Sequence, residues 1–251
     1  MSRSEHGVVA AGHPLTAQAG ARVLREGGNA VDAALGAMLV SFVAEPLLTG
    51  LGAGGYMLVA GRGAQPALLD FFVAAPSDQR ADGDDGGGSR AQLRAIDVSF
   101  GDAAQVFHIG PASCGVYGAP AGVCEAARRW GSVPLEDLAA PAARLAHDGV
   151  VLNHGQAYVA RILSDLLTST PECADLWAPG GAILREGELL RNPELGDALE
   201  RLARDGPEPF YTGDIARAVH DWLRERGGSL TPADLSDYTA LEREPVRIRY
   251  R

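Results

Sequence analysis

The 251-residue sequence predicts a layered α+β fold. Three observations lead to this class: two helical patterns open the chain, two strand-like segments follow them directly, and most of the second half has helical periodicity. Helices and strands that are grouped in this way are typical of layered α+β proteins rather than of repeating βαβ units. With 46% hydrophobic and 22% charged residues, the chain has the composition of a globular protein that buries a sizeable core.

Two helices are predicted at the start of the chain. Residues 15–26 carry apolar side chains at helical spacing, and Gly27 is a residue type that ends helices because it tolerates positive φ. Asn29 then occupies an N-cap position, with Asp32 three residues later as in a capping box. The helix that follows is apolar nearly all round and ends at Glu45, so we expect it to be buried.

Strand-like segments come next. Residues 56–60 and 67–73 have the apolar composition of strands, and the glycine-containing segment 61–63 between them favours a hairpin. Residues 77–94 are rich in Asp, Gly, Ser and Arg, which is typical of a flexible surface loop. Residues 96–109 then return to strand-like patterning.

From residue 119 onward the pattern is mainly that of short helices. They are predicted at residues 121–130, 135–148, 156–167, 194–205 and 214–226. Thr231, Pro232 and Asp234 combine an N-cap, a proline at the first helical position and an acid at the third, which marks another helix start. Residues 246–251 alternate apolar side chains with arginine, so we expect a half-buried terminal strand.

Charge and composition exclude several classes of partner. Acidic residues outnumber basic ones by 32 to 22, giving a formal net charge of −10, whereas nucleic-acid binding needs a clustered basic surface. All basic residues are arginine, so no lysine is available as a Schiff base or general base. The N-terminus lacks the pattern of a secretory signal, and no apolar run is long enough to cross a bilayer. We therefore predict a cytoplasmic protein with no nucleic-acid or membrane partner.

Two short motifs favour structural interpretations. Gly50, Gly52 and Gly55 match GxGxxG, but a helix precedes them and a strand follows, the reverse of the dinucleotide-binding order. We interpret them as a tight connection with close backbone packing and unusual dihedrals, and a nucleotide-binding module is the weaker alternative. Ser113 lacks one glycine of the GxSxG nucleophile pattern and is interpreted as a loop serine.

The cysteines and histidines indicate no metal site. Cys114 and Cys124 with His108 fit no zinc-ligand spacing, so we expect the two cysteines to pack as small apolar side chains; Cys173 completes no CxxC motif. The six histidines stand singly, with no HExxH motif and no evident carboxylate partner. They are His6, His13, His108, His147, His154 and His220. Composition and spacing therefore predict no metal, no cofactor and no catalytic constellation.

As an ordered set of motifs, the sequence strongly resembles the N-terminal, large-subunit part of the γ-glutamyltranspeptidase (glutathione hydrolase) family. The resemblance covers essentially the entire chain. The segments that carry it are GVVAAGHPL (7–15), AQAG (17–20), GGNAVDAA (27–34), EP (45–46), GLGAGGY (50–56), LDF (69–71), AP (75–76), GAPAG (118–122), LAAPA (138–142), HDG (147–149), LRNP (190–193) and FYTG (210–213).

This resemblance implies an N-terminal-nucleophile hydrolase fold, a four-layer αββα sandwich that is incomplete in this chain. In the family, a precursor cuts itself into large and small subunits. The hydroxyl of the small subunit's new N-terminal threonine attacks the γ-glutamyl amide, and its free amine acts as the base. We expect that threonine downstream of Arg251, so no catalytic residue is assigned here. The implied partners are a small-subunit part, from the same precursor or a separate chain, and a small-molecule amide substrate.

One substrate ligand of the family belongs to this part of the chain. It is an arginine directly after the Asp-Phe pair, whose guanidinium binds the α-carboxylate of glutamate. This sequence has Phe72 at that position, within LDFFVAAP (69–76). Because a neutral ring cannot replace the bidentate contact, the loss corresponds to a few kcal/mol of substrate binding. The resemblance thus predicts an amidohydrolase or acyltransferase whose substrate differs from glutathione, such as an acyl amide with an apolar group.

The alternative interpretation is a catalytically silent fragment, or a structural or split subunit that needs a second polypeptide. Both interpretations treat residues 1–251 as a single large-subunit region. Residues 1–118 would supply sandwich elements with the flexible loop 77–94, and residues 119–251 a mainly helical region that ends in a strand.

Overall fold

The computed structural model describes residues 7–61, 65–77 and 93–250. The elements of the first half are α1 Pro14–Arg25, α2 Ala30–Ala44, β1 Gly55–Val59, β2 Ala67–Phe71, β3 Arg94–Ser99, β4 Ala104–Ile109 and a 3-10 turn, η2, at Pro111–Ser113. The chain continues with α3 Ala119–Trp130, α4 Leu135–Asp148, β5 Val150–Val151, α5 His154–Ile162, α6 Ser164–Leu167, α7 Pro171–Trp177, β6 Leu189–Leu190, α8 Pro193–Asp205, α9 Glu208–Tyr211, α10 Asp214–Glu225, α11 Pro232–Ser236 and β7 Leu241–Arg243. The predicted mixture of helices and strands is confirmed.

The start of α2 is held by the predicted capping box. The Asn29 side chain accepts from the backbone N–H of Asp32, and the Asp32 carboxylate accepts from the N–H of Asn29 at 2.8 Å. Asp32 is fully buried and also accepts from the N–H groups of Ser132 and Val133 at 2.8 and 3.2 Å. Burial raises the pKa of Asp32, but hydrogen bonds from Ser132, Asn29 and Val133 outweigh it and lower the pKa overall. One carboxylate thus joins α2 to the connection between α3 and α4.

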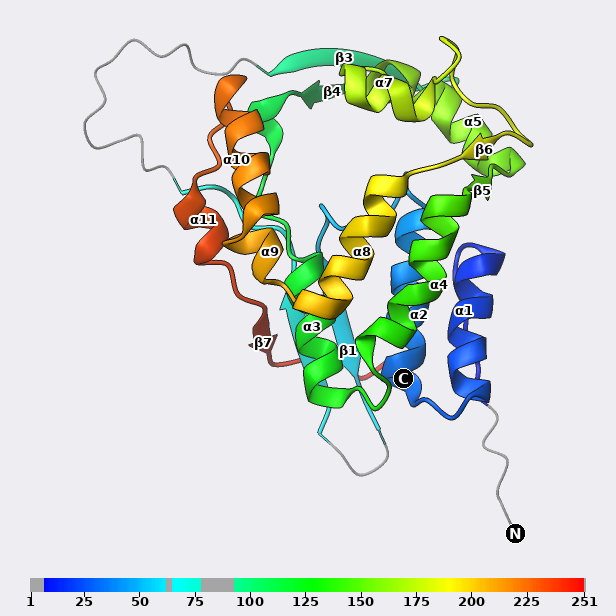
Figure 1. The fold of residues 1–251 in the computed structure, drawn as a ribbon, viewed down its shortest axis with the longest axis vertical. Coiled ribbons are helices and arrows are strands. Elements are labelled where there is room, and N and C mark those ends of the chain that lie inside the picture. Colours follow the sequence, from blue (N-terminus) through cyan, green and yellow to red (C-terminus); the bar gives the residue numbers. More distant parts are fainter. Residues whose placement is uncertain (1–6, 62–64, 78–92, 251) are drawn as a thin grey trace.

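The main core lies between α2 and the helices around it. Leu35, Leu39 and Val40 of α2 are at most 1% exposed, as expected for a helix that is apolar nearly all round. Figure 1 shows α1, α2, α4 and α8 side by side, and Leu199 and Leu202 of α8 belong to the same core. A smaller cluster includes Ala160 of α5 and the buried Trp177 of α7.

The three-stranded sheet has the order β1-β2-β7, with both neighbouring pairs antiparallel. Its inner face contributes Leu69 and Phe71 to the core, and α3 crosses in front of β1 (Figure 1). On the other face of the sheet, Tyr56 lies opposite Asp70 and Leu58 lies opposite Leu68. On the same face, Leu241 and Arg243 of β7 lie opposite Asp70 and Leu68 respectively. We call these six residues the open face: Tyr56, Leu58, Leu68, Asp70, Leu241 and Arg243. Its apolar side chains include Tyr56 at 58% and Leu58 at 61% exposed.

The predicted terminal strand is wrong. Residues 244–250 form no strand, and Val246, Ile248 and Tyr250 are at least 80% exposed, while the strand β7 lies earlier in the chain. The register between β2 and β7, continued by two residues, would set Pro245 opposite Pro66. Because proline has no backbone N–H, the ladder ends there.

Several other boundaries differ from those predicted. Residues 96–109 form two strands, β3 and β4, since Gly101 adopts a φ of 85° in the turn between them. The helix predicted over 156–167 is divided into α5 and α6 at Leu163. The close backbone packing predicted for Gly50, Gly52 and Gly55 is found at Gly54. A Cβ at Gly54 would lie 2.5 Å from the backbone oxygen of Phe71.

None of Gly50, Gly52 and Gly55 has a positive φ, so the unusual dihedrals predicted for the GxGxxG segment are not found. As predicted, the segment follows α2 and leads into a strand, β1, of which Gly55 is the first residue. The predicted flexible loop 77–94 falls mostly on residues 78–92, which lie outside the described residues. Among the helices that the structure describes, none is long and apolar enough to cross a membrane.

Candidate functional site

A cavity of about 590 Å³ opens where β2 leaves the sheet. Its lining includes open-face residues of β1, β2 and β7 together with the segment around α11. The residues that matter for its chemistry are Tyr56, Asp70, Phe72, Asp234, Tyr238 and Arg243. Phe72, the single site residue named from the sequence, thus lies in a pocket of a size suited to a small molecule.

Phe72 forms an aromatic wall of this pocket. Its ring stacks on that of Tyr56, with centroids 5.5 Å apart and planes inclined by 14°. The backbone of Phe72 is held on both sides, because its N–H donates to Asp70 Oδ1 at 3.0 Å and its carbonyl accepts from Tyr238 OH at 2.8 Å. The position where the resemblance implies a guanidinium therefore carries a fixed, half-exposed aromatic ring.

The guanidinium that does line the pocket comes from a different strand. Arg243 of β7 donates from Nε to Asp70 Oδ2 at 2.9 Å, across the strand pair that holds Phe72. The Phe72 N–H, and then Arg243, lower the pKa of the Asp70 carboxyl. Asp70 is therefore an anion at neutral pH, and Arg243 is engaged with it.

Another part of the lining is acidic. Asp234 accepts from both the N–H and the hydroxyl of Ser77, at 2.8 and 2.5 Å, and from Thr231 in the predicted capping box. Burial raises the pKa of Asp234, but the bonds from Ser77 and Thr231 outweigh it and hold the pKa at about 2. With Asp237, the lining contains three carboxylates and one guanidinium, so the pocket disfavours a free carboxylate ligand.

A line of three tyrosines connects this pocket with the core. The Tyr211 ring stacks on that of Tyr238, with centroids 5.5 Å apart and planes inclined by 4°, and the Tyr117 ring centroid lies 5.6 Å from that of Tyr211. The hydroxyl of Tyr211 donates to Tyr117 O at 2.9 Å, and burial raises the pKa of Tyr117 and Tyr238 to about 12. No sequence motif indicates these three tyrosines, because they are far apart in sequence and meet only through tertiary packing.

The other sequence candidates do not form a catalytic group among the described residues. Ser113 Oγ donates to Gly110 O at 2.7 Å within its own 3-10 turn, as expected for a loop serine. Cys114 and Cys124 are free and partly buried, and burial raises the pKa of Cys124 to about 12. His108 does not join them in any group of metal-ligating side chains within the described ranges.

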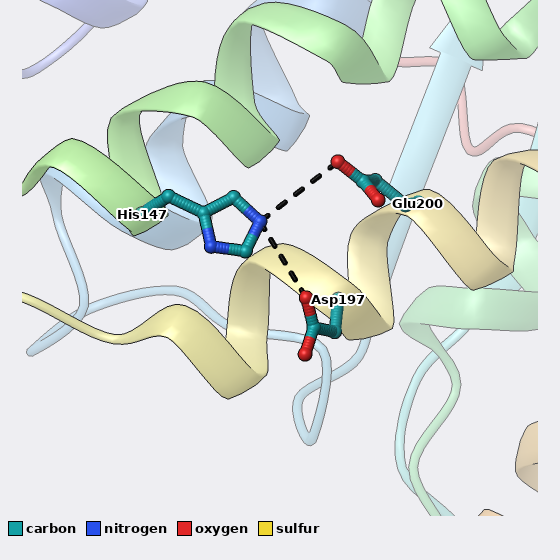
Figure 2. Close-up of side chains that lie close together, drawn as sticks. All are labelled: His147, Asp197 and Glu200. Atoms are coloured by element: carbon teal, nitrogen blue, oxygen red, sulfur yellow. Dashed lines mark ion pairs between the residues drawn. The ribbon is translucent and has the colours of Figure 1, made fainter.

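The expectation that the histidines lack carboxylate partners is wrong for two of them. His154 Nδ1 lies 2.9 Å from Glu186 Oε2. His147 at the end of α4 faces Asp197 and Glu200 of α8, as Figure 2 shows. These partners lie 32 to 53 residues away, so only the packing of helices and loops reveals them.

Helices cover one face of an antiparallel sheet and a pocket opens at a strand end, so the chain is a layered α+β protein with a pocket beside its sheet. Residues 16–251 match the family described as Gamma-glutamyltranspeptidase. The chain therefore belongs to the γ-glutamyltranspeptidase family. It is 33% identical to the Acylase ACY 1 proenzyme of Pseudomonas sp. (strain V22), covering 98% of this chain and 43% of the relative.

Other similar proteins are named as a glutathione hydrolase and as a γ-glutamyltranspeptidase. The Glutathione hydrolase proenzyme of Escherichia coli (strain K12) is 31% identical, over 99% of this chain and 41% of its own length. The structure of the γ-glutamyltranspeptidase from Pseudomonas nitroreducens complexed with L-DON superposes with a TM-score of 0.80 at 30% identity, covering 99% of this chain and 70% of that one. The chain thus spans about two fifths of the length of these curated relatives.

Proposed function

We propose that this chain is the non-nucleophile part of a γ-glutamyltranspeptidase-like amidohydrolase or acyltransferase whose acyl substrate differs from glutathione. Phe72 is the observation that carries the proposal. Its half-exposed ring, stacked on Tyr56, occupies the position where the resemblance implies an α-carboxylate-binding arginine.

The chemistry of the pocket supports an apolar acyl group. A glutamate α-carboxylate would meet Asp70, Asp234 and Asp237, while Arg243 already donates to Asp70. An aromatic or aliphatic acyl group would instead pack on the rings of Phe72 and Tyr56, and aromatic pairs contribute about 0.5–1.5 kcal/mol beyond their buried area. The similarity to an acylase proenzyme is compatible with such a substrate.

The nucleophile would come from outside these 251 residues. In the proposed reaction, a threonine hydroxyl attacks the amide carbonyl, the free amine of the same threonine takes the proton, and the amine product leaves. Water or an amine then attacks the acyl ester and regenerates the hydroxyl. The pocket beside Phe72 would hold the acyl group during both steps.

We also infer how the fold is completed. The open face exposes Tyr56, Leu58 and Leu241 by 46% or more, although the inner face of the same sheet is packed in the core. Apolar side chains on one face of a sheet are covered in sandwiches by a second sheet about 10 Å away. A small-subunit part packed here would give the αββα sandwich, with residues 1–251 as a single large-subunit region.

Substrate choice tests this function. The chain would be produced together with its downstream part, and turnover of γ-glutamyl-p-nitroanilide would be compared with that of phenylacetyl-p-nitroanilide. We expect preference for the phenylacetyl compound, and Phe72→Arg to shift the preference toward the γ-glutamyl compound. Phe100→Arg is the matched control, since Phe100 is 45% exposed and lies near Phe107 away from the pocket. Selective turnover of the γ-glutamyl compound by the unchanged protein would overturn the proposal.

The alternative is a structural subunit without catalysis, which the open face also supports. The same preparation distinguishes the two functions. A folded assembly that binds its partner part and yet turns over no γ-glutamyl or acyl p-nitroanilide would favour the structural role.

A further inference from the structure

His147, Asp197 and Glu200 form a cluster that the proposed amidase chemistry does not use. His147 lies in the last turn of α4, while Asp197 and Glu200 are three residues apart on α8. Residues at that spacing share one face of a helix. Figure 2 shows the Nε2 edge of the imidazole directed at both carboxylates, and one ligand atom from each residue lies within 4.8 Å of the others.

We propose that these three side chains bind a divalent transition-metal ion of the zinc type. The two distances from the imidazole are longer than a direct hydrogen bond and close to the separation of two ligands on one ion. His147 Nε2 lies 3.5 Å from Asp197 Oδ1 and 3.8 Å from Glu200 Oε1. A charge-assisted N–H···O bond would be about 2.7–2.9 Å. Two ligands on a tetrahedral zinc ion, each about 2.1 Å from the metal, are separated by about 3.4 Å.

The surrounding structure fixes the two helices that carry the cluster. The His147 ring lies against Gly196, where a Cβ would be 2.6 Å from His147 Nε2, so a larger residue at 196 would displace the imidazole. Leu199 and Leu202 anchor α8 in the main core, to which Ala142, Ala143 and Ala146 of α4 also belong. The ligands therefore project from two helices whose separation is already fixed by packing.

The ligand set and its environment select the kind of ion. One imidazole and two carboxylates suit zinc and its neighbours, whereas calcium and magnesium prefer oxygen ligands throughout. Arg201 and Arg204 follow on α8, but they pair with Asp214 and Asp205 respectively. The side chains of His147, Asp197 and Glu200 are 37%, 72% and 57% exposed, so an ion can enter and water can complete its coordination.

Binding would clamp the end of α4 to α8. Since the site requires both helices in their folded positions, a bound ion would stabilise the native state. The cluster contains no residue of the pocket around Phe72, so metal binding here is independent of the proposed amidase function.

Metal titration of the full chain tests the site. Zinc would be titrated in competition with a chromophoric chelator, and cobalt in its place would report the geometry through visible absorption. We expect one zinc per chain and a zinc-dependent rise in the melting temperature. His147→Ala should abolish both effects, and Asp197→Asn or Glu200→Gln should each weaken zinc binding by about tenfold or more.

Two variants provide matched controls. His154→Ala removes an exposed histidine that pairs with one carboxylate, and Cys173→Ser removes an exposed thiol, so both should bind zinc as the unchanged chain does. Circular dichroism shows whether each variant is folded. If His147→Ala does not fold, zinc binding by Asp197→Asn and Glu200→Gln decides whether the cluster is the site. Absence of zinc binding, or binding that is unchanged in the folded cluster variants, would overturn the site.

Discussion

Phe72 and Tyr56 stack across the end of the β1–β2 pair, with their ring centroids 5.5 Å apart and their planes inclined by 14°. Phe72 follows β2 and Tyr56 belongs to β1, so the antiparallel register brings the two rings together on the open face. Asp70, directly across from Tyr56, accepts from the N–H of Phe72. The strand pairing therefore builds the aromatic wall, and each residue of the wall can be tested separately.

Tyr56→Ala should weaken binding of an aromatic acyl amide without unfolding the chain. The substitution removes one half of the aromatic wall, and a pair of this kind contributes about 0.5–1.5 kcal/mol, or about two- to tenfold in KM. Steady-state kinetics of the protein produced with its downstream part measure the change. Phe107→Ala, in the remote pair with Phe100, should leave KM unchanged. Equal KM effects from both variants would contradict a role for Tyr56 in the pocket.

Leu58→Glu should prevent the large-subunit region from assembling with its downstream part. Leu58 is 61% exposed on the open face, and a charge buried there by a second sheet would be unpaired and costly. Co-purification of the two parts measures assembly. Val106→Glu is the control, because Val106 is 50% exposed on β4, outside the open face. Normal assembly of the Leu58 variant would argue against a sheet packed on this face.

Asp234→Asn should lower stability at neutral pH, and the difference from the unchanged chain should shrink as pH falls. The pKa of Asp234 is held at about 2 in the folded chain, below its model-compound value of 3.8. A depressed folded-state pKa stabilises the fold above pH 4, and that stabilisation is lost as pH falls from about 4 to about 2. Urea unfolding at several pH values measures the difference in unfolding free energy between the two proteins. A difference that does not change with pH would contradict a lowered pKa of Asp234 in the folded chain.

Gly118→Ala should destabilise the chain and disturb the pocket. A Cβ at Gly118 would lie 1.9 Å from Phe71 O and 2.2 Å from the hydroxyl of Tyr238, the group that holds Phe72 O. Overpacking of this kind costs about 1–3 kcal/mol or more, which urea denaturation can detect. Gly52→Ala is the matched control, since a Cβ there meets nothing within 4 Å. Similar losses at both glycines would show that the clash is not the cause.

Asp32→Ala should be among the more destabilising single changes in the chain. It removes the acceptor of three backbone N–H groups, those of Asn29, Ser132 and Val133, at a site with no exposure. An unsatisfied buried N–H costs about 1–3 kcal/mol, so we expect a loss of about 3 kcal/mol or more. Asp221→Ala, on the exposed side of α10, should change stability little. Thermal unfolding compares the two, and a small effect at Asp32 would contradict its linking role.

Local signals in the sequence predicted much of the fold correctly. The capping boxes at Asn29 and Asp32 and at Thr231 and Asp234 each join residues three apart. The rules of helix capping are therefore sufficient to predict both helix starts from the sequence. The strand predicted at residues 246–251 failed because a strand depends on a partner, and its partner's ladder ends at Pro66. A pattern of alternating apolar residues does not show where the pairing with the partner strand ends.

The site was predicted less completely than the fold. Phe72 was found because it interrupts a family pattern at a known offset from Asp70 and Phe71. Its surroundings were missed, since Tyr238 is 166 residues and Arg243 is 173 residues from the groups they bind. The cluster at His147 was missed for the same reason, as only the packing of α4 on α8 brings its members together.

The proline that follows β7 also bears on the exposed edge of the sheet. β7 is an edge strand, and exposed edges are where a second copy can add a strand and begin aggregation. β7 has only three residues, and Pro245 just after it has no backbone N–H, so few backbone groups at this edge are free to pair with another strand. The same proline that ends the sheet therefore shortens the stretch of backbone at which another strand could add to the β7 edge.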